Sequence, residues 1–247
     1  VLHKLTGRYV KLLCLDVEPL QASLDLAQKV LVSAEGHDLI VVIGSGTLCD
    51  LGKYAGNASG KPVLVFPTAP SMNGYTSGIV ALSVQGLKQT IPVRPVTGVF
   101  ADPEVLAKAP SRMVAAGFAD FVSKTSASAD WMIAHTLRHE PYMPEAFSFY
   151  EAIYEEVLSS AEMVGKGDPI AIAKVTEALL KSGLSMLVAG ASSPASGGEH
   201  LISHYLDMKS ALDNTPHDLH GAQVGVATIH TLAFWERITQ TDFETLD

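Results

Sequence analysis

The first hundred residues alternate between short apolar runs and longer stretches whose apolar residues recur at helical spacing. Strands are predicted at Val10–Leu15, Asp38–Gly44, Lys61–Phe66 and Gly98–Asp102. Helices are predicted over Ser23–Ala34, where Ser23 can act as the N-cap, and over Thr47–Ala58. Helices that cross between successive strands favour a parallel sheet. The segments Ile79–Val84 and Lys88–Val93 predict a hairpin appended to that sheet.

The strand pattern ends at Pro103, and the rest of the chain reads as helical. Helical stretches are predicted at Pro110–Leu137, Glu145–Val164, Pro169–Ala189, Glu199–Leu206 and Leu219–Ile238. The change of character near residue 105 predicts an α/β domain over residues 1–105 and an all-helical domain over residues 106–247.

Composition narrows the classes of partner. Hydrophobic residues make up 47% of the 247 residues and charged residues 17%, which is a balance typical of a globular, core-rich protein. The net charge of −9 and the lack of a dense Lys/Arg cluster argue against nucleic acid or an anionic membrane as a partner. No apolar run approaches the length of a membrane span. Cys14 and Cys49 lie far apart, which fits a reducing compartment, and we expect a cytoplasmic location.

Two loops follow neighbouring predicted strands. In the first, Gly44, Ser45 and Gly46 join a buried strand to a helix, where backbone N–H groups and the helix dipole suit a pyrophosphate. The fingerprint G-x-G-x-x-G is incomplete, because Cys49 stands where its third glycine would be, and a plain tight turn remains an alternative.

The second loop, "FPTAPSMNGYTSG", is rich in hydroxyl groups. These belong to Thr68, Ser71, Tyr75, Thr76 and Ser77. Two such loops at the carboxyl ends of neighbouring parallel strands favour a nucleotide site over a polar surface loop.

The chain has nine histidines, and four of them fall between positions 200 and 220. His200 and His204 are one helical turn apart, while His217 and His220 follow the helix-breaking segment "LDNTP". This is not H-E-x-x-H, so a zinc-protease reading lacks its general base. Two histidines without cysteine suit Zn, Ni or Fe, and a carboxylate is the natural third ligand. Asp120 is the candidate for this third ligand. The alternative is that Asp120 is an acidic residue on the surface of a helix.

Six segments occur in the order of a known family. They are "GSGTLCDLGKY", "PTAPSMNGYTS", "FADPEVLAKAP", "AGFADFVSK", "SGGEHLISHYLDM" and "HGAQVGVAT". Together they resemble the sn-glycerol-1-phosphate dehydrogenase family, in particular its bacterial AraM-type branch, within the superfamily of iron-containing alcohol dehydrogenase, glycerol dehydrogenase and dehydroquinate synthase. The resemblance implies a Rossmann-like amino-terminal domain, a helical metal domain and a site in the cleft between them. Members of that family are longer, so the chain is expected to be incomplete at both ends.

The resemblance also implies roles for individual residues. Cofactor binding would fall to Gly46, Thr47, Leu48, Cys49, Asp50, Thr68, Ala69, Pro70, Ser71 and Ser77. One divalent metal ion, Ni or Zn, would be bound by Asp120, His200 and His220. His204 would contact the substrate and relay a proton, and His217 is left without a role. Asn73 and Asp120 would also contact the substrate, although the family usually has Asp at position 73.

The implied reaction is the NAD(P)H-dependent reduction of dihydroxyacetone phosphate to sn-glycerol 1-phosphate, a step of phospholipid biosynthesis, by an enzyme expected to be a homodimer. Polarisation of the carbonyl by the metal would assist hydride transfer. A glycerol-type polyol dehydrogenase and a dehydroquinate-synthase-like cyclase would use the same frame. A non-catalytic binding protein that kept the fold is the alternative from another class.

Overall fold

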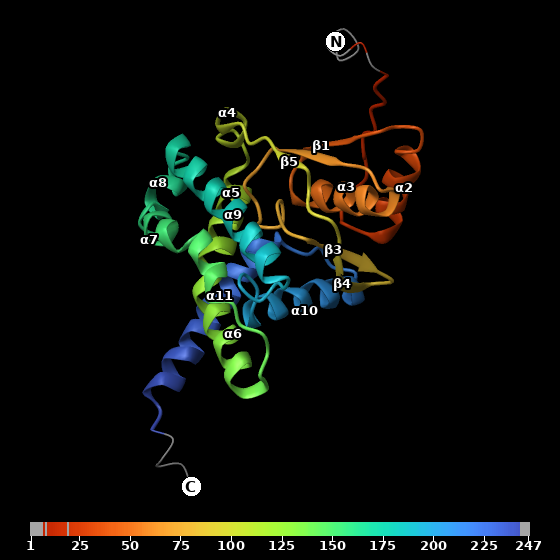
Figure 1. Ribbon diagram of the computed structural model, residues 1–247. Helices are drawn as coiled ribbons and strands as arrows, with labels where there is room; N and C mark the ends of the chain where they lie inside the picture. Colours follow the sequence, from red (N-terminus) through yellow and green to blue (C-terminus); the bar gives the residue numbers. More distant parts are fainter. Residues whose placement is uncertain (1–6, 8, 19, 243–247) are drawn as a thin grey trace.

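The computed structural model describes residues 7, 9–18 and 20–242. Its first part alternates helices and strands, coloured red to yellow in Figure 1. In chain order these are α2 (Leu24–Ser33), β1 (Ile40–Gly44), α3 (Gly46–Ser59), β2 (Val63–Pro67), β3 (Ile79–Val84), β4 (Leu87–Pro92) and β5 (Gly98–Val99). The second part, green to blue, is helical.

Strands β1, β2 and β5 form a parallel sheet in the order β1-β2-β5, as predicted from the crossover helices. The prediction that the hairpin is appended to this sheet is wrong, because β3 and β4 pair with each other as a separate two-stranded antiparallel sheet. Val80 and Leu82 of β3 are buried with Ala27 of α2 and Leu51 of α3. The hairpin is thus held by apolar packing against the helices instead of by hydrogen bonds to the parallel sheet.

Helix α3 covers one face of the parallel sheet. Val42, Val63 and Val65 point to that face and are buried. Ile43 and Phe66 lie on the opposite face and are exposed, and Phe66 stacks on Phe100 with ring centroids 5.1 Å apart. The sheet therefore has one packed face and one apolar face that is exposed to solvent.

The ends of the helices in this part follow local signals. Ser23 caps α2 as predicted, since its hydroxyl accepts a hydrogen bond from the Leu26 N–H at 3.3 Å. Gly60 ends α3 with a left-handed backbone at φ 75°. The predicted strand Val10–Leu15 is wrong: this segment has no regular structure, and Leu12 is 76% exposed. A strand needs a partner edge for its backbone groups, and no described strand pairs with this segment.

The helical part contains shorter elements than the apolar pattern predicted. They are α4 (Pro103–Leu106), α5 (Ser111–Val122), α6 (Lys124–Arg138), the 3-10 helix η1 (Pro144–Phe149), α7 (Glu151–Ser159), α8 (Ala161–Gly165), α9 (Pro169–Ala189), α10 (Gly198–Asp213) and α11 (His220–Gln240). The bounds predicted for α9 are confirmed, because Asp168 caps it and Gly190 at φ 64° ends it. The stretch predicted over Glu145–Val164 is three elements, η1, α7 and α8.

The stretch predicted over Pro110–Leu137 is interrupted at Ser123. The Ser123 hydroxyl and the Lys124 ammonium both donate to the backbone carbonyl of Asp120, at 2.7 and 2.6 Å. These side chains compete with the helical hydrogen bond to that carbonyl, which explains why the helix breaks here. The break places Lys124 beside the Asp120 carboxylate, with consequences described below.

The core of the helical part lies between α5 and α9. Phe121 of α5 is fully buried together with Val175 and Leu179 of α9 and Val157 of α7. Figure 1 shows α5 and α9 beside each other, with α11 against α5 and α10, and with α10 next to strand β4 of the hairpin. Within the described residues, no helix is both long enough and apolar enough to cross a membrane.

Close packing of α3 on the sheet gives the first prediction. A Cβ at Gly56 would lie 2.1 Å from Cγ2 of the buried Val63 and 3.1 Å from the Lys61 carbonyl oxygen. We expect Gly56→Ala to lower the free energy of unfolding by about 1–3 kcal/mol through overpacking. Urea denaturation measures the change. Gly165→Ala is the matched control, since nothing lies within 4 Å of its Cβ, and an equal loss in both variants would contradict the packing argument.

Candidate metal centre and the cavity around it

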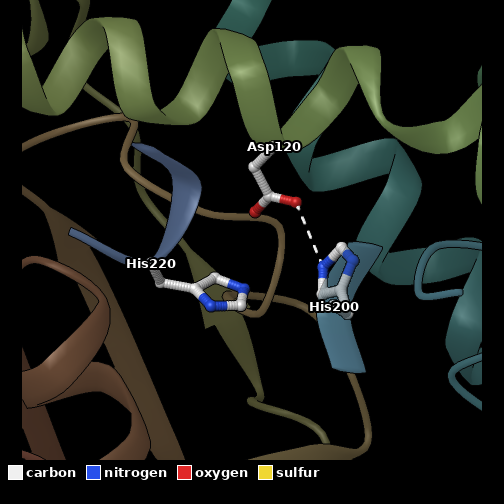
Figure 2. A group of neighbouring side chains, drawn as sticks. All are labelled: Asp120, His200 and His220. Carbon is white, nitrogen blue, oxygen red and sulfur yellow. Dashed lines mark ion pairs between the residues drawn. The ribbon is translucent and has the colours of Figure 1, made fainter. Parts of the chain in front are cut away.

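Three helices bring together the three residues predicted as metal ligands. Asp120 comes from α5, His200 from the first turn of α10, and His220 is the first residue of α11. One ligand atom from each lies within 4.8 Å of the other two. Figure 2 shows the carboxylate and the two imidazole rings pointing toward one another.

The Asp120 carboxylate is fully buried, and both of its oxygens are engaged. The Lys124 ammonium lies 2.8 Å from Oδ1, and the Asn73 backbone N–H donates to Oδ2 at 3.0 Å. Burial alone would raise the pKa of Asp120, but the charge of Lys124 and the hydrogen bond with His200 outweigh it and lower the pKa well below its usual range. The group is therefore a carboxylate at neutral pH.

His200 is oriented by a second carboxylate. Its Nδ1 lies 2.8 Å from Oε1 of the buried Glu199, so Nδ1 carries the hydrogen of that contact, and Nε2 faces Oδ1 of Asp120 at 3.6 Å. Burial lowers the pKa of His200, but Asp120 and Glu199 raise it by more. A histidine between two carboxylates attracts either a second proton or a metal cation to Nε2.

His220 is held in the neutral form. The Ser203 hydroxyl donates its one hydrogen to Oε1 of Gln223 at 2.7 Å, and its oxygen lies 3.1 Å from Nδ1 of His220. Nδ1 is then the donor to Ser203, which leaves the lone pair on Nε2. Burial and the charge of His200 lower the pKa of His220 to about 3.

These three side chains fit a divalent cation. They offer one carboxylate and two imidazole nitrogens with lone pairs, on atoms that lie within 4.8 Å of one another, and this is a donor set that divalent ions such as Zn accept. The far nitrogens of the two rings donate hydrogen bonds to Glu199 and Ser203, which is the support that metal-binding histidines usually have.

The other two histidines of the cluster lie outside this set. The ring centroids of His204 and His220 are 6.3 Å apart, and both side chains line a large cavity described below. Burial, then the charges of His200 and Lys88, lower the pKa of His204. Nδ1 of His217 is 3.7 Å from Oδ1 of Asp207. Asp207 lies on α10, two turns after His200.

A large cavity of about 1630 Å³ opens beside the three candidate ligands, between the α/β part and the helices. Of the residues predicted to bind cofactor, substrate or metal, it is lined by Thr47, Asp50, Asn73, Ser77, His200, His204 and His220. Gly46, Leu48, Cys49, Thr68, Ala69, Pro70 and Ser71 are not among the residues that line it, and neither is the fully buried Asp120. Cys49 is fully buried as well, and burial raises the pKa of its thiol to about 12.

The loop after β2 is fixed by a buried lysine. Lys53 of α3 donates to the carbonyls of Gly74 and Ile79, both at 2.7 Å, and to the Ser77 hydroxyl at 3.1 Å. Asp50, one turn earlier on α3, accepts a hydrogen bond from the Ala81 N–H at 3.2 Å, and burial raises its pKa. Helix α3 therefore sets the path of the chain that leads from Asn73 into the hairpin.

The same loop lies directly on two helices of the helical part. A Cβ at Gly117 of α5 would be 1.6 Å from the Pro70 carbonyl oxygen. A Cβ at Gly183 of α9 would be 2.5 Å from the Asn73 carbonyl oxygen and 2.1 Å from the Thr76 hydroxyl. Only glycine permits this approach, which brings the Asn73 N–H to the Asp120 carboxylate.

The sequence did not reveal several of these contacts. Lys124 stands four residues after Asp120, the spacing of a helical ion pair, so that signal was available. No pattern in the sequence indicated the roles of Glu199, Ser203 and Lys53, because their hydrogen bonds become apparent only once the chain has folded. Asn73 lines the cavity as expected, and its Nδ2 is buried without a hydrogen-bond partner among the described residues.

One family model and several known proteins are similar to this chain. A family described as iron-containing alcohol dehydrogenase matches residues 1–110. The chain is 37% identical over 220 residues to "Glycerol-1-phosphate dehydrogenase [NAD(P)+]" of Halalkalibacterium halodurans. The matched segment covers 89% of this chain and 55% of that protein. The protein of the same name from Thermococcus kodakarensis is 35% identical over 215 residues, 85% of this chain and 60% of its own length. The chain thus spans a little over half the length of these relatives.

Solved structures show the same fold at lower identity. A probable glycerol dehydrogenase from Sinorhizobium meliloti matches with a TM-score of 0.70 and 19% identity, over 85% of this chain and 60% of that one. Maleylacetate reductase from Agrobacterium tumefaciens matches with a TM-score of 0.65 and 20% identity, over 90% and 59%.

The second prediction concerns acid stability. The pKa of His220 falls from 6.5 to about 3 on folding, so its neutral form is favoured in the folded chain. The resulting stability is fully present above pH 6.5 and is lost as the pH falls toward 3. For metal-free protein we expect a loss of about 2 kcal/mol between pH 7 and pH 5 from this group.

Urea midpoints between pH 7 and pH 5 measure this loss. His220→Asn removes the titrating group and should give a flatter profile. His230→Asn, at an exposed position of the same helix, serves as the control. If the profile keeps its slope in His220→Asn, then the burial of His220 does not govern the acid response.

Proposed function

We propose that the chain belongs to the iron-containing alcohol dehydrogenase family and that it reduces dihydroxyacetone phosphate to sn-glycerol 1-phosphate with NAD(P)H and a divalent metal ion. The observation that carries this proposal is the meeting of Asp120, His200 and His220 at one side of a large cavity. The names of the relatives supply the substrate and the cofactor of the proposal.

We assign the metal ion to Asp120, His200 and His220, and propose Ni or Zn because two imidazoles and one carboxylate suit these ions. When bound, the metal would polarise a substrate carbonyl as a Lewis acid, and the reduced nicotinamide would supply the hydride. The chain's own contribution is to hold the three ligands ready: Glu199 and Ser203 fix the tautomers of the two rings, and Lys124 keeps the carboxylate ionised.

For the cofactor we propose the two loops at the carboxyl ends of β1 and β2. We propose that Gly46 to Asp50 lie along the diphosphate. No side chain caps the amino terminus of α3 at Ser45, so the N–H groups of the first turn, Gly46 to Leu48, can face a diphosphate, whereas the Cys49 N–H donates to the Ser45 carbonyl at 3.1 Å. Thr47, Asp50 and Ser77 line the cavity beside this terminus. Thr68 to Ser71 would approach the nicotinamide side through their backbone.

We propose that His204 relays a proton to the substrate oxygen as the carbonyl is reduced to the alcohol. It lines the cavity one helical turn from His200, and its lowered pKa keeps it a neutral imidazole that can donate through one ring nitrogen and be refilled from water. Asn73 would contact a substrate oxygen through its unpartnered Nδ2, which is buried in the cavity wall.

Further parts of the proposal concern the whole protein. The division near residue 105 would separate a nucleotide-binding domain from a metal-binding domain, with the reaction in the cavity between them. A homodimer and a cytoplasmic location complete the proposal. The test of function is elemental analysis of the purified chain together with NADH and NADPH oxidation assays. Dihydroxyacetone phosphate is compared there with dihydroxyacetone and with the heptulosonate substrate of a cyclase. Activity on either alternative substrate in place of dihydroxyacetone phosphate would refute the assignment.

The third prediction tests the metal assignment. His220→Ala removes one imidazole ligand together with its hydrogen bond to Ser203, so metal content should fall well below one ion per chain. Activity should fall by at least about 10²-fold with it. Elemental analysis of the dialysed protein measures the first effect. Full occupancy in the variant would remove His220 from the ligand set. His230→Ala, on the exposed side of α11, controls for the loss of an imidazole.

The fourth prediction concerns Asn73. Asn73 is only 8% exposed to solvent, and its backbone N–H donates to the Asp120 carboxylate. An Asp at this position would therefore add a negative charge at a nearly buried site. A charged hydrogen bond is stronger than a neutral one by about 1 kcal/mol, so Asn73→Asp should change kcat/KM by about tenfold or less. Asn57→Asp, at an exposed site on α3, is the matched control. If Asn73→Asp instead activates an inactive native chain a thousandfold, Asn73 marks an altered function.

A further inference from the structure

The cavity beside the candidate metal centre has an unfavourable lining for an anion. Six acidic residues line it: Glu18, Asp50, Asp130, Glu140, Asp207 and Asp218. Lys88 and Arg112 are the two lysine or arginine residues among its described lining residues. Since the chain carries a net charge of −9, a dianionic substrate must find a local cation in order to bind here.

Most of the nearby cations already have partners. Lys53 and Lys124 are buried, and each is surrounded by several acceptors. Arg112 is 74% exposed and makes two hydrogen bonds to the Asp218 carboxylate, at 2.7 and 2.8 Å. These three side chains have fixed positions that serve other groups.

Lys88 differs from them. It lies on β4 with 20% of its side chain exposed, and in the described part of the chain its ion-pair partner is Asp207 of α10, at 3.3 Å. An ammonium has three hydrogens, so one contact leaves two of them for a ligand. Asp207 is 12% exposed, and its Oδ1 has no hydrogen-bond partner among the described residues, so this carboxylate is positioned mainly by Lys88 and His217.

The position of Lys88 relative to the metal centre follows from the helix. His200, His204 and Asp207 stand at spacings of four and three residues on α10, so they share one face, and all three line the cavity. Seven residues of helix span about 10 Å, which places Lys88 roughly two turns from His200, with His204 between. The charge of Lys88 also acts on His204, since it contributes to the lowered pKa of that ring.

We propose that Lys88, positioned by Asp207, binds the phosphate of the substrate and thereby selects phosphorylated over unphosphorylated trioses. This inference rests on the proposed function. A three-carbon substrate with its carbonyl near His200 would extend its phosphate along α10 past His204, toward the Lys88 ammonium. The flexible lysine stem closes the remaining distance, and a point charge suits a rotating phosphate group.

The diphosphate of the cofactor presents the same chemistry and is the other possible ligand of Lys88. The two differ in what a charge-removing substitution changes. Loss of a substrate contact alters the preference for dihydroxyacetone phosphate over dihydroxyacetone. Loss of a cofactor contact weakens NAD(P)H binding equally for both substrates.

The experiment compares native protein with Lys88→Met, loaded to equal metal content. The ratio of kcat/KM for dihydroxyacetone phosphate to that for dihydroxyacetone should fall about 10- to 100-fold, as expected for the loss of a charge-assisted hydrogen bond. The dissociation constant of NADH, measured by fluorescence, should stay within about twofold. Lys88→Arg should restore most of the ratio. Lys166→Met, which removes the same charge from an exposed ion pair with Glu162 at the end of α8, should leave the ratio unchanged.

Two further measurements keep the outcome interpretable. Lys88→Met leaves Asp207 without its cation, so the double variant Lys88→Met/Asp207→Asn removes the unpaired charge in case the single variant folds poorly. Calorimetric titration with inorganic phosphate reports binding without turnover, and it should be weakened at least about tenfold in both variants.

An unchanged substrate ratio with unchanged phosphate binding overturns the proposal, and so does a weakened NADH affinity with an unchanged ratio, which assigns Lys88 to the cofactor. Phosphate binding that depends on Lys88 in a chain that reduces no triose supports an anion site here and refutes the proposed reaction instead.

Discussion

A fully buried carboxylate is the constraint on which the rest of this molecule depends. An ionised Asp120 in the interior is tolerated only if both oxygens are matched, and the two partners come from different parts of the fold. Lys124 reaches Oδ1 because the helix breaks at Ser123, and the Asn73 N–H reaches Oδ2 because the loop after β2 lies against α5. The α/β part is therefore joined to the helical part at the residue that the cavity is built around.

His200 and His220 are each held by a hydrogen bond that fixes which ring nitrogen carries the proton. Glu199 takes the Nδ1 hydrogen of His200, and Ser203, committed to Gln223, takes that of His220. Each ring is thus fixed in orientation and tautomer by a neighbour on α10, before any ion arrives. The acceptors that remain point at the Asp120 carboxylate, so the electrostatics of the site are those of a place prepared for positive charge.

What the sequence could predict here was what neighbouring residues determine. Caps and periodicity located α2, α3 and α9, because Ser23, Asp168 and the glycines at positions 60 and 190 act within one turn. The break at Ser123 escaped, since it depends on side chains that compete for one carbonyl, and the strand at Val10–Leu15 was wrong because a strand requires a partner edge. The family resemblance named Asp120, His200 and His220, which do meet. The lysines at positions 53 and 88 act across distances that no local pattern records, whereas Lys124 stands at the spacing of a helical ion pair with Asp120.

The approach of the loop to Gly117 and Gly183 has a consequence for reading variation in such proteins. Neither glycine touches a ligand atom of the candidate centre, yet any side chain at either position pushes on the backbone that delivers the Asn73 N–H to Asp120. In a saturation scan scored by activity, both positions would be as intolerant as the metal ligands themselves. Intolerance alone therefore does not mark chemistry in this fold, and a scan of abundance run alongside the activity scan separates spacers from ligands.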